Sequence, residues 1–293
     1  MSSGIPGSEP RDGDLKVNGL RLHFIDWGGQ GEPILIVHAT GFLGRIYAPI
    51  AEALRPLGHV YSYDQAGHGD SERPALEQVG WDRTADDLEA FILAMGLSGV
   101  RAIGHSAGGT VIAAVAGRRA DLISCGVLVD PVIVHPASPL EAPADLRERT
   151  LKRRRTFDSV AAAYDNFVRK PPYDTWQPEI LRAYCEYGTR ANPDGSRTLK
   201  CPPEIEAQIY ATGRDFDGLE FVMRCDAPLL VMFGEGTNSP GIELAAQIAD
   251  ANPRRKVTIV PGTTHFIPME QPEIVARMAA DFFREQKREG QAK

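Results

Sequence analysis

Residues 100–111 of the chain read VRAIGHSAGGTV, and this stretch decides how the fold is interpreted. Its first half is an apolar run of strand length, and the small and β-branched residues after it predict a helix. The turn between them has the pattern Gly-x-Ser-x-Gly, with Ser106 at its centre. Such a turn exposes the serine hydroxyl, and its glycines leave room for the adjoining strand and helix. The stretch therefore predicts a nucleophile at Ser106; the alternative is a glycine-rich turn that only packs tightly.

Apolar runs of similar length lie on both sides of this turn and alternate with amphipathic, helix-length segments. Such alternation is typical of a mostly parallel sheet flanked by helices. The expected strands are residues 15–17, 20–25, 34–37, 60–64, 100–104, 126–130, 228–233 and 256–260, with helices near 46–57, 84–96, 110–119 and 242–251 and after 272.

The alternation breaks between Pro131 and Val222, where the chain is rich in Pro, Arg and aromatic residues. A break of this length inside a regular α/β pattern indicates an inserted, mainly helical unit. We therefore predict a core made of residues 15–130 and 223–293, interrupted by an insertion at 131–222. The first 14 residues mix Gly, Pro, Ser and both signs of charge, and we expect a flexible tail there.

The composition narrows the class of partner. The 293 residues carry a net charge of −7, with a pI of about 5.6. A negative field repels nucleic acid and anionic membranes, so we expect neither as a partner and a small molecule as substrate. The four cysteines lack the spacing of a zinc site, and no apolar stretch is long enough for a signal or a span. We expect a cytoplasmic protein with reduced cysteines, no metal and no cofactor; the sequence does not define its oligomeric state.

A serine nucleophile needs a base, because its hydroxyl is scarcely ionised at neutral pH. His265 follows the expected strand 256–260, in a loop at the carboxyl edge of the sheet, where functional groups of open α/β sheets gather. His23 and His59 lie in or next to strands and are expected to be structural. His105 adjoins Ser106, with its ring expected to point away from the attacking oxygen. We therefore predict His265 as the base.

The acid that orients His265 has two candidates. Glu235 lies in the loop after strand 228–233, which also contains the neutral Asn238. Asp130 ends the strand that follows the helix after Ser106, and both strand ends border the same edge of the sheet. We favour Asp130, because an aspartate ending a buried strand is otherwise costly to place. The alternatives are an Asp130 that caps the turn into the insertion and a solvated Glu235.

Four motifs in this order make the chain resemble the α/β-hydrolase superfamily over nearly its whole length after Asp14. They are HATGF at 38–42, DQAGHGDS at 64–71, GHSAG at 104–108 and GTTHF at 262–266. The resemblance implies that Thr40 and Ala107 donate backbone N–H groups to an oxyanion, and that the insertion is a cap over Ser106. Some members carry their acid where Asp130 stands, which implies a Ser106-His265-Asp130 triad.

Two departures from the superfamily pattern concern the site. Ala39 stands where glycine is usual, so the oxyanion loop is expected to differ slightly in shape. The loop 234–238 lacks the aspartate that commonly completes the triad. Because Ser106 is the nucleophile in place of aspartate, haloalkane dehalogenase and epoxide hydrolase chemistry is disfavoured.

The resemblance implies cleavage of an ester, thioester or lactone through an acyl-enzyme on Ser106, as in a carboxylesterase, thioesterase or lactonase. Hydrolysis of a carbon–carbon bond and cofactor-free perhydrolysis are alternatives, as is a ligand receptor with negligible turnover. The candidate substrate contacts are Phe42, His105, Trp176, Tyr184 and Phe266.

Three other polar features have plainer interpretations. His38 and Asp64 are expected to hold loops through backbone hydrogen bonds. The run Lys152–Arg155 matches either a binding site for an anionic substrate or a solvated helix face, and we favour the solvated face.

Overall fold

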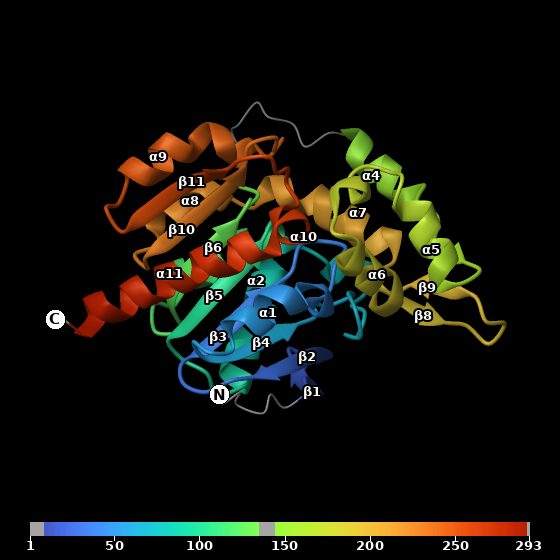
Figure 1. The fold of residues 1–293 in the computed structure, drawn as a ribbon, viewed down its shortest axis with the longest axis horizontal. Helices are drawn as coiled ribbons and strands as arrows, with labels where there is room; N and C mark the ends of the chain where they lie inside the picture. The colour runs from blue at the N-terminus through green and yellow to red at the C-terminus, as the bar shows by residue number, and fades with distance from the viewer. Residues whose placement is uncertain (1–8, 135–143, 292–293) are drawn as a thin grey trace, which may run out of the picture.

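The computed structural model describes residues 9–134 and 144–291. An eight-stranded sheet forms the centre of this part, in the order β1-β2-β4-β3-β5-β6-β10-β11 (Figure 1). The two pairings that involve β2 are antiparallel, and every pairing from β4 to β11 is parallel. The strands are β1 (Arg11–Val17), β2 (Leu20–Gly28), β3 (Pro33–Val37), β4 (His59–Tyr63), β5 (Val100–His105), β6 (Ile123–Val129), β10 (Leu229–Gly234) and β11 (Arg255–Val260).

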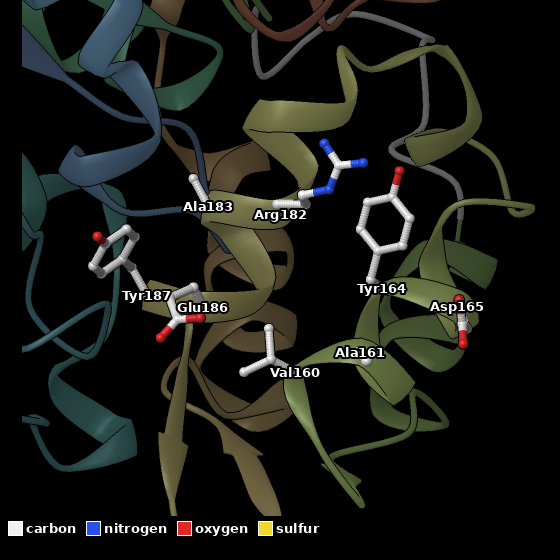
Figure 2. A pocket seen from close by; sticks show the side chains of 8 residues that line it. All are labelled: Val160, Ala161, Tyr164, Asp165, Arg182, Ala183, Glu186 and Tyr187. Carbon is white, nitrogen blue, oxygen red and sulfur yellow. The ribbon is translucent and has the colours of Figure 1, made fainter.

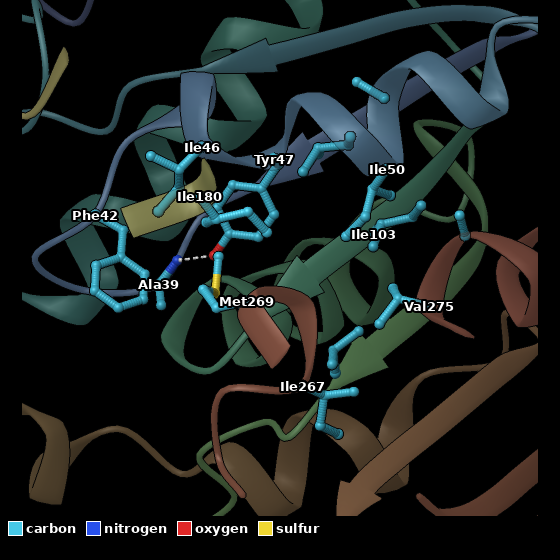
Figure 3. Close-up of a cluster of buried hydrophobic side chains, with 14 of the residues drawn as sticks. Ala39, Phe42, Ile46, Tyr47, Ile50, Ile103, Ile180, Ile267, Met269 and Val275 are labelled. Carbon is cyan, nitrogen blue, oxygen red and sulfur yellow. Dashed lines mark hydrogen bonds between the residues drawn. The ribbon is translucent and has the colours of Figure 1, made fainter. Parts of the chain in front are cut away.

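Helices cover both faces of this sheet and divide the core into two apolar clusters. Helices α1 (Ala48–Leu54) and α11 (Pro272–Gln291) pack on one face, and Figure 3 shows part of the cluster they bury. On the other face lie α2 (Trp81–Ala94), α3 (Ala107–Arg118), α8 (Gly218–Arg224) and α9 (Ala245–Asp250). The expected sheet flanked by helices is confirmed. Within the described ranges, no helix has both the length and the apolar composition needed to cross a bilayer.

The insertion forms a mainly helical unit beside the central sheet (Figure 1). A small antiparallel sheet, in the order β7-β9-β8, belongs to this unit and does not join the central one. Ile180 packs into the core cluster on the α1 face, so the unit shares its apolar interior with the core (Figure 3). Its elements are α4 (Ala144–Leu151), β7 (Thr156–Phe157), α5 (Val160–Phe167), α6 (Pro178–Tyr187), β8 (Thr189–Ala191), β9 (Arg197–Leu199) and α7 (Pro203–Thr212).

The first strand begins earlier than expected. Residues 11–14, predicted to belong to a flexible tail, form the start of β1 and pair with β2 in the register Arg11↔Asp26. Arg11 also forms an ion pair of 2.8 Å with Asp26. Strand formation here depends on pairing along an exposed edge, which leaves no apolar alternation in the sequence. Of the rest of the expected tail, residues 9–10 precede β1 without regular structure, and residues 1–8 lie outside the described residues.

The core resumes before residue 223, the expected boundary. Helix α8 begins at Gly218 and packs against α3 of the core. The contact is close, because a Cβ on Gly218 would lie 2.9 Å from the Thr110 Cγ2. The sequence of a short helix does not indicate whether it packs on the central sheet or within the insertion. The contact of α8 with α3 assigns it to the core.

Candidate active site

Ser106 lies at a strained turn between β5 and α3, with φ +55° and ψ −123°. Non-glycine residues rarely adopt positive φ, and such strain is typical of functional sites. The two motif glycines make the turn possible. A Cβ on Gly104 would lie 2.5 Å from the carbonyl oxygen of Gly108, and one on Gly108 would lie 2.4 Å from that of Val37. The Gly-x-Ser-x-Gly pattern is therefore a steric requirement of this turn.

Ser106, His265 and Asp130 form one hydrogen-bonded row. The His265 Nε2 lies 2.9 Å from the Ser106 Oγ, and its Nδ1 lies 2.7 Å from the Asp130 Oδ1. A carboxylate accepts and does not donate, so Nδ1 carries the proton and Nε2 is free to accept from the serine hydroxyl. The three residues come from the ends of β5 and β6 and from the loop after β11, which meet at the carboxyl edge of the sheet.

Asp130 is held in place from several sides. It is fully buried and has a positive φ of 44°. Besides His265, its carboxylate accepts hydrogen bonds from the Gly234 N–H at 2.8 Å and from the Thr237 hydroxyl at 2.7 Å. These donors suit a charged carboxylate and fix its orientation toward the imidazole. Sequence analysis did not identify Thr237, because the sequence does not show that the loop after β10 lies next to the end of β6.

Glu235, the other candidate acid, points elsewhere. It is exposed, and its carboxylate accepts from the Gly262 N–H at 3.0 Å. The end of β10 and the loop after it therefore contribute Gly234 and Thr237 as donors to Asp130, and no acid to His265. This arrangement explains how the loop 234–238 lacks the usual aspartate while the site keeps a carboxylate.

The loop between β3 and α1 lies beside Ser106 and forms a tight turn. The Phe42 N–H donates to the Ala39 carbonyl at 3.1 Å, and Gly41 has a φ of +82°. Ala39 is buried, so the turn accommodates its methyl group. The backbone N–H groups of Thr40 and Ala107 donate no hydrogen bond to any residue in the described part of the chain. Both amides are thus available to an oxyanion.

Two buried histidines hold this loop. Burial lowers the pKa of His68 to about 4, so the ring is neutral; its Nδ1 donates to the Ala66 carbonyl and its Nε2 accepts from the Gly41 N–H at 3.0 Å. Burial also lowers the pKa of His38, to about 3, and its Nε2 accepts from the Gln65 N–H at 2.9 Å. His38 therefore supports loop structure, as expected.

Asp64 supports the same region through backbone groups. Its carboxylate accepts from the N–H groups of Gly44, at 2.7 Å, and Asp70, at 2.9 Å. Asp64 also pairs with His23 at 3.0 Å, and Lys200 pairs with Asp70 at 2.6 Å. The ligand atoms of His23, Asp64 and Asp70 lie within 4.8 Å of one another, a spacing that metals use. Their protein partners account for this cluster without a metal.

A directed chain of hydrogen bonds links the oxyanion loop to His265. The Ala39 N–H donates to the Tyr47 hydroxyl at 3.2 Å (Figure 3), and the Tyr47 O–H contacts the His105 Nδ1 at 2.8 Å. The His105 Nε2 contacts the His265 carbonyl at 2.8 Å. Because a carbonyl only accepts, Nε2 carries the proton and Nδ1 accepts from Tyr47. Burial lowers the pKa of His105 to about 3, which keeps this ring neutral.

This chain changes the expected role of His105. The sequence suggested a substrate contact, but the ring is buried and both of its nitrogens have protein partners. The geometry gives His105 a positioning role instead, because the oxyanion loop and the His265 backbone are tied through it. Sequence analysis did not identify Tyr47. The available signal was a tyrosine on the apolar face of the expected helix 46–57, where a buried hydroxyl needs a hydrogen-bond partner.

The aromatic residues expected at the substrate do gather beside the triad. Phe42 has ring centroid distances of 5.1 Å to Trp176, 5.8 Å to Tyr184 and 6.1 Å to Phe266. The Phe266 ring lies 5.2 Å from the imidazole of His265. The insertion thus reaches the neighbourhood of the triad through the aromatic residues around α6. Contact of these residues with substrate stays a prediction.

A groove of about 750 Å³ lies elsewhere in the insertion, between helices α5 and α6 (Figure 2). All of its lining residues belong to these two helices, and none of them belongs to the triad or the aromatic cluster. Tyr164 and Arg182 contact each other across it, with the guanidinium 5.3 Å from the ring centre. The groove is therefore separate from the site at Ser106. Its lining residues are Val160, Ala161, Tyr164, Asp165, Arg182, Ala183, Glu186 and Tyr187.

Comparison with known proteins agrees with the fold. A sheet of this topology with a serine elbow and a helical insertion defines an α/β hydrolase. The chain belongs to the alpha/beta hydrolase family, whose model matches residues 34–278.

Two curated relatives and one solved structure illustrate the likeness. The 2-(acetamidomethylene)succinate hydrolase of Mesorhizobium japonicum is 24% identical over 87% of this chain and 88% of its own length. A bifunctional esterase/perhydrolase of Acinetobacter calcoaceticus is 24% identical over 91% of this chain and 97% of its own. A crystal structure of E-2-(acetamidomethylene)succinate hydrolase superposes with a TM-score of 0.84 at 22% identity, covering 94% of this chain and 100% of that one. Membership of this family supports hydrolase activity, but it does not identify the bond that is cleaved.

Proposed function

We propose that this protein is a serine acyl hydrolase, in which Ser106 attacks the carbonyl carbon of a small ester, thioester, lactone or amide. The observation that carries the proposal is the direction of the row Ser106–His265–Asp130. Each hydrogen bond in it has its donor and acceptor where proton transfer from serine needs them. The proposal assigns the nucleophile to Ser106, the general base to His265 and the orienting acid to Asp130.

In the first half of the reaction, the Ser106 Oγ forms a bond to the carbonyl carbon while His265 Nε2 takes the hydroxyl proton. Asp130 stabilises the imidazolium that results. The carbonyl electron pair moves to oxygen, and the N–H groups of Thr40 and Ala107 stabilise that oxyanion. The intermediate then collapses, the bond to the leaving group breaks, and His265 gives the leaving group its proton. An acyl-Ser106 remains.

In the second half, His265 takes a proton from water as the water oxygen attacks the acyl carbon. Collapse of the second intermediate breaks the bond to Ser106 Oγ, which regains its proton from His265. The products are a carboxylic acid and the free enzyme, so the reaction needs no cofactor. The buried, hydrogen-bonded carboxylate of Asp130 supports this cycle because its orientation is set before substrate binds.

The curated relatives support acyl transfer and widen the choice of bond. The name of the Mesorhizobium japonicum relative denotes a succinate that bears an amide, and that of the Acinetobacter calcoaceticus relative denotes an esterase. We therefore include amides beside the esters, thioesters and lactones that the sequence suggested. A small carboxylate-bearing acyl compound is the kind of substrate that the first relative favours.

Covalent labelling tests the proposal and separates it from a receptor role. We expect a fluorophosphonate to add one label per chain, located at Ser106 by peptide mass spectrometry. Brief incubation with p-nitrophenyl acetate should release p-nitrophenol with an initial burst and leave an acetylated Ser106. A wild-type protein that takes up neither label, although folded, would contradict the proposal and favour a receptor. Labelling at another serine would contradict the assignment of the nucleophile.

Perhydrolysis is a second candidate, supported by the name of the esterase/perhydrolase relative. In that reaction hydrogen peroxide replaces water as the acceptor of the acyl group, and the product is a peracid. Adding hydrogen peroxide to the p-nitrophenyl acetate reaction should then divert acetyl-Ser106 to peracetic acid, measured by iodide oxidation. Hydrolysis of a carbon–carbon bond remains a further alternative and calls for a vinylogous diketone substrate in the same assay.

A further inference from the structure

The basic run Lys152–Arg155 does not form one solvated face. Arg153 turns inward, and its guanidinium forms an ion pair with Glu206 of α7. Their side chains are 18% and 8% exposed, whereas that of Lys152 is 77% exposed. The neighbouring Arg154 is also exposed. One cation of this run is therefore placed inside the insertion, where a charge is costly unless it has a use or a full set of partners.

Arg153 lacks that full set. Its Nε is buried and has no hydrogen-bond acceptor in the part of the chain that the structure describes. Glu206 engages another nitrogen of the guanidinium, and the second Glu206 oxygen accepts from the Tyr210 hydroxyl at 3.1 Å. Among the described residues, the one carboxylate paired with Arg153 is thus already shared. A buried unpaired donor needs an explanation, and a bound acceptor is one.

Trp176, which also belongs to the insertion, has a second buried N–H donor without an acceptor. Its side chain is 5% exposed, and its indole Nε1 has no acceptor among the described residues. The other two tryptophans differ, since Trp27 donates to the Ser62 hydroxyl at 2.9 Å and Trp81 to the Ile209 carbonyl at 2.8 Å. Indole N–H groups are normally paired when buried, so Trp176 stands out within this protein.

The two unpaired donors share the same neighbours. The Tyr173 ring lies 5.0 Å from that of Trp176, and Arg153 lies close enough to this tyrosine to affect its ionisation. Burial raises the pKa of Tyr173 and of Tyr184, so both hydroxyls stay protonated. Tyr184 lies 5.8 Å from Trp176 between ring centres. Among the described residues, the cluster therefore contains several donors around the carboxylate of Glu206.

This cluster adjoins the catalytic machinery. A Cβ on Gly41, next to Thr40, would lie 3.0 Å from the carboxylate of Glu206. Trp176 contacts Phe266, the residue after His265, with ring centres 5.9 Å apart. The cluster thus adjoins both the oxyanion loop and the loop that carries His265.

We propose that the Arg153 Nε and the Trp176 Nε1 bind a carboxylate of the substrate, which is therefore an acyl compound with a second, anionic end. A carboxylate offers two oxygens to two N–H donors, and a guanidinium beside it supplies the opposite charge. A neutral carbonyl has only one oxygen to accept from these donors, and it would not balance the positive charge of the Arg153 guanidinium. The inference rests on the proposed function for the reacting end, and it assigns the other end to the cap.

Calorimetric binding of succinate and of the neutral succinamide tests the inference without any need for turnover. We expect wild-type protein to bind succinate about tenfold or more tightly than succinamide, in line with a charge-assisted pair. Trp176→Phe and Arg153→Gln should each weaken succinate binding about tenfold and leave succinamide binding unchanged. The matched controls Trp81→Phe and Arg154→Gln, which alter donors outside the cluster, should bind succinate like wild type.

Equal binding of the two ligands by wild-type protein, or no binding of succinate, would overturn the inference. So would a folded Trp176→Phe protein with wild-type affinity for succinate. If circular dichroism shows Arg153→Gln to be unfolded, Trp176→Phe decides, because it removes an N–H that has no partner in the protein. Fluorophosphonate labelling is read separately, so a labelled protein that ignores succinate contradicts this inference and leaves the proposed hydrolase intact.

Discussion

Around Ser106, the side chains of the triad and of His105 have partners within the protein, whereas two side-chain N–H groups of the insertion have none among the described residues. The Asp130 carboxylate accepts three hydrogen bonds, and both nitrogens of His105 are engaged. In the cap, Arg153 Nε and Trp176 Nε1 lack acceptors in the described structure. The difference teaches that the reacting groups are oriented before substrate arrives, while the cap keeps donors that suit a ligand.

Substitutions in the two regions should affect specificity differently. Substitutions at the triad should reduce the rate by the same factor for every substrate, because they act on the reacting carbonyl. Substitutions among the cap donors should distinguish charged from neutral substrates, because they act on the far end. The following experiments, from the largest effect to the smallest, probe the core side of the comparison.

Ser106→Ala should lower kcat for p-nitrophenyl acetate on the order of 10⁴–10⁶-fold, because the nucleophile is lost while the oxyanion donors remain. Stopped-flow or discontinuous assay of p-nitrophenol release measures the effect, with thermal unfolding to show that the fold is kept. Ser124→Ala, which removes an exposed hydroxyl bonded to the Gly99 carbonyl, is the matched control. Near-normal turnover by folded Ser106→Ala would refute the assignment.

Asp130→Asn should lower kcat on the order of 10³–10⁴-fold, because an amide in that place favours the wrong tautomer of His265 and stabilises its charge poorly. Glu235→Gln should stay within about twofold of wild type, since its exposed carboxylate accepts from the Gly262 N–H and, in the described structure, does not bind His265. Steady-state kinetics on a common ester compares the two. The reverse order of losses would return the acid to the loop after β10.

Tyr47→Phe should lower kcat about tenfold with little change in KM, because it removes the hydrogen bond that ties the oxyanion loop to His105. Tyr63→Phe is a matched control, since the Tyr63 hydroxyl is buried without a partner in the described structure. Kinetics at several pH values and urea unfolding of both variants separate positioning from stability. Equal kcat values for the two variants would remove Tyr47 from the positioning chain.

The buried neutral histidines predict how stability depends on pH. With the pKa of His68 lowered to about 4, the folded protein binds fewer protons than the unfolded chain between about pH 6.5 and 4. The free energy of unfolding should therefore fall as pH falls through this range, and rise as pH rises. His68→Gln, whose amide oxygen can still accept from Gly41, should reduce that slope by about 1.4 kcal/mol per pH unit. Urea titrations at pH 6 and pH 4.5 measure this slope. An unchanged slope in His68→Gln would show that groups other than His68 bind the protons taken up on unfolding.

Much of the core was predictable because its signals are local. The strand before Ser106, the strained turn and the helix after it follow from an apolar run, two glycines and small residues within residues 100–111. The buried strands β3, β5 and β10 are mostly apolar, and their ends lie within one residue of the expected ones. Strand β6 begins at Ile123, three residues before the start that the sequence indicates. The edge strand β1 began earlier than expected, because exposed pairing leaves no apolar pattern.

The sequence by itself determined the turn at Ser106, the place of His265 at a strand end, and the order of elements that makes the sheet. These depend on steric limits of the backbone and on hydrophobic periodicity, which act between near neighbours. Only the tertiary structure decided between Asp130 and Glu235, because two strand ends 104 residues apart, at Asp130 and Gly234, must meet before a donor can choose its acceptor. It also turned Arg153 inward among exposed cations. Burial of this one charge depends on the packing of α7 against α4 within the insertion, which leaves no mark in the run Lys152–Arg155 itself.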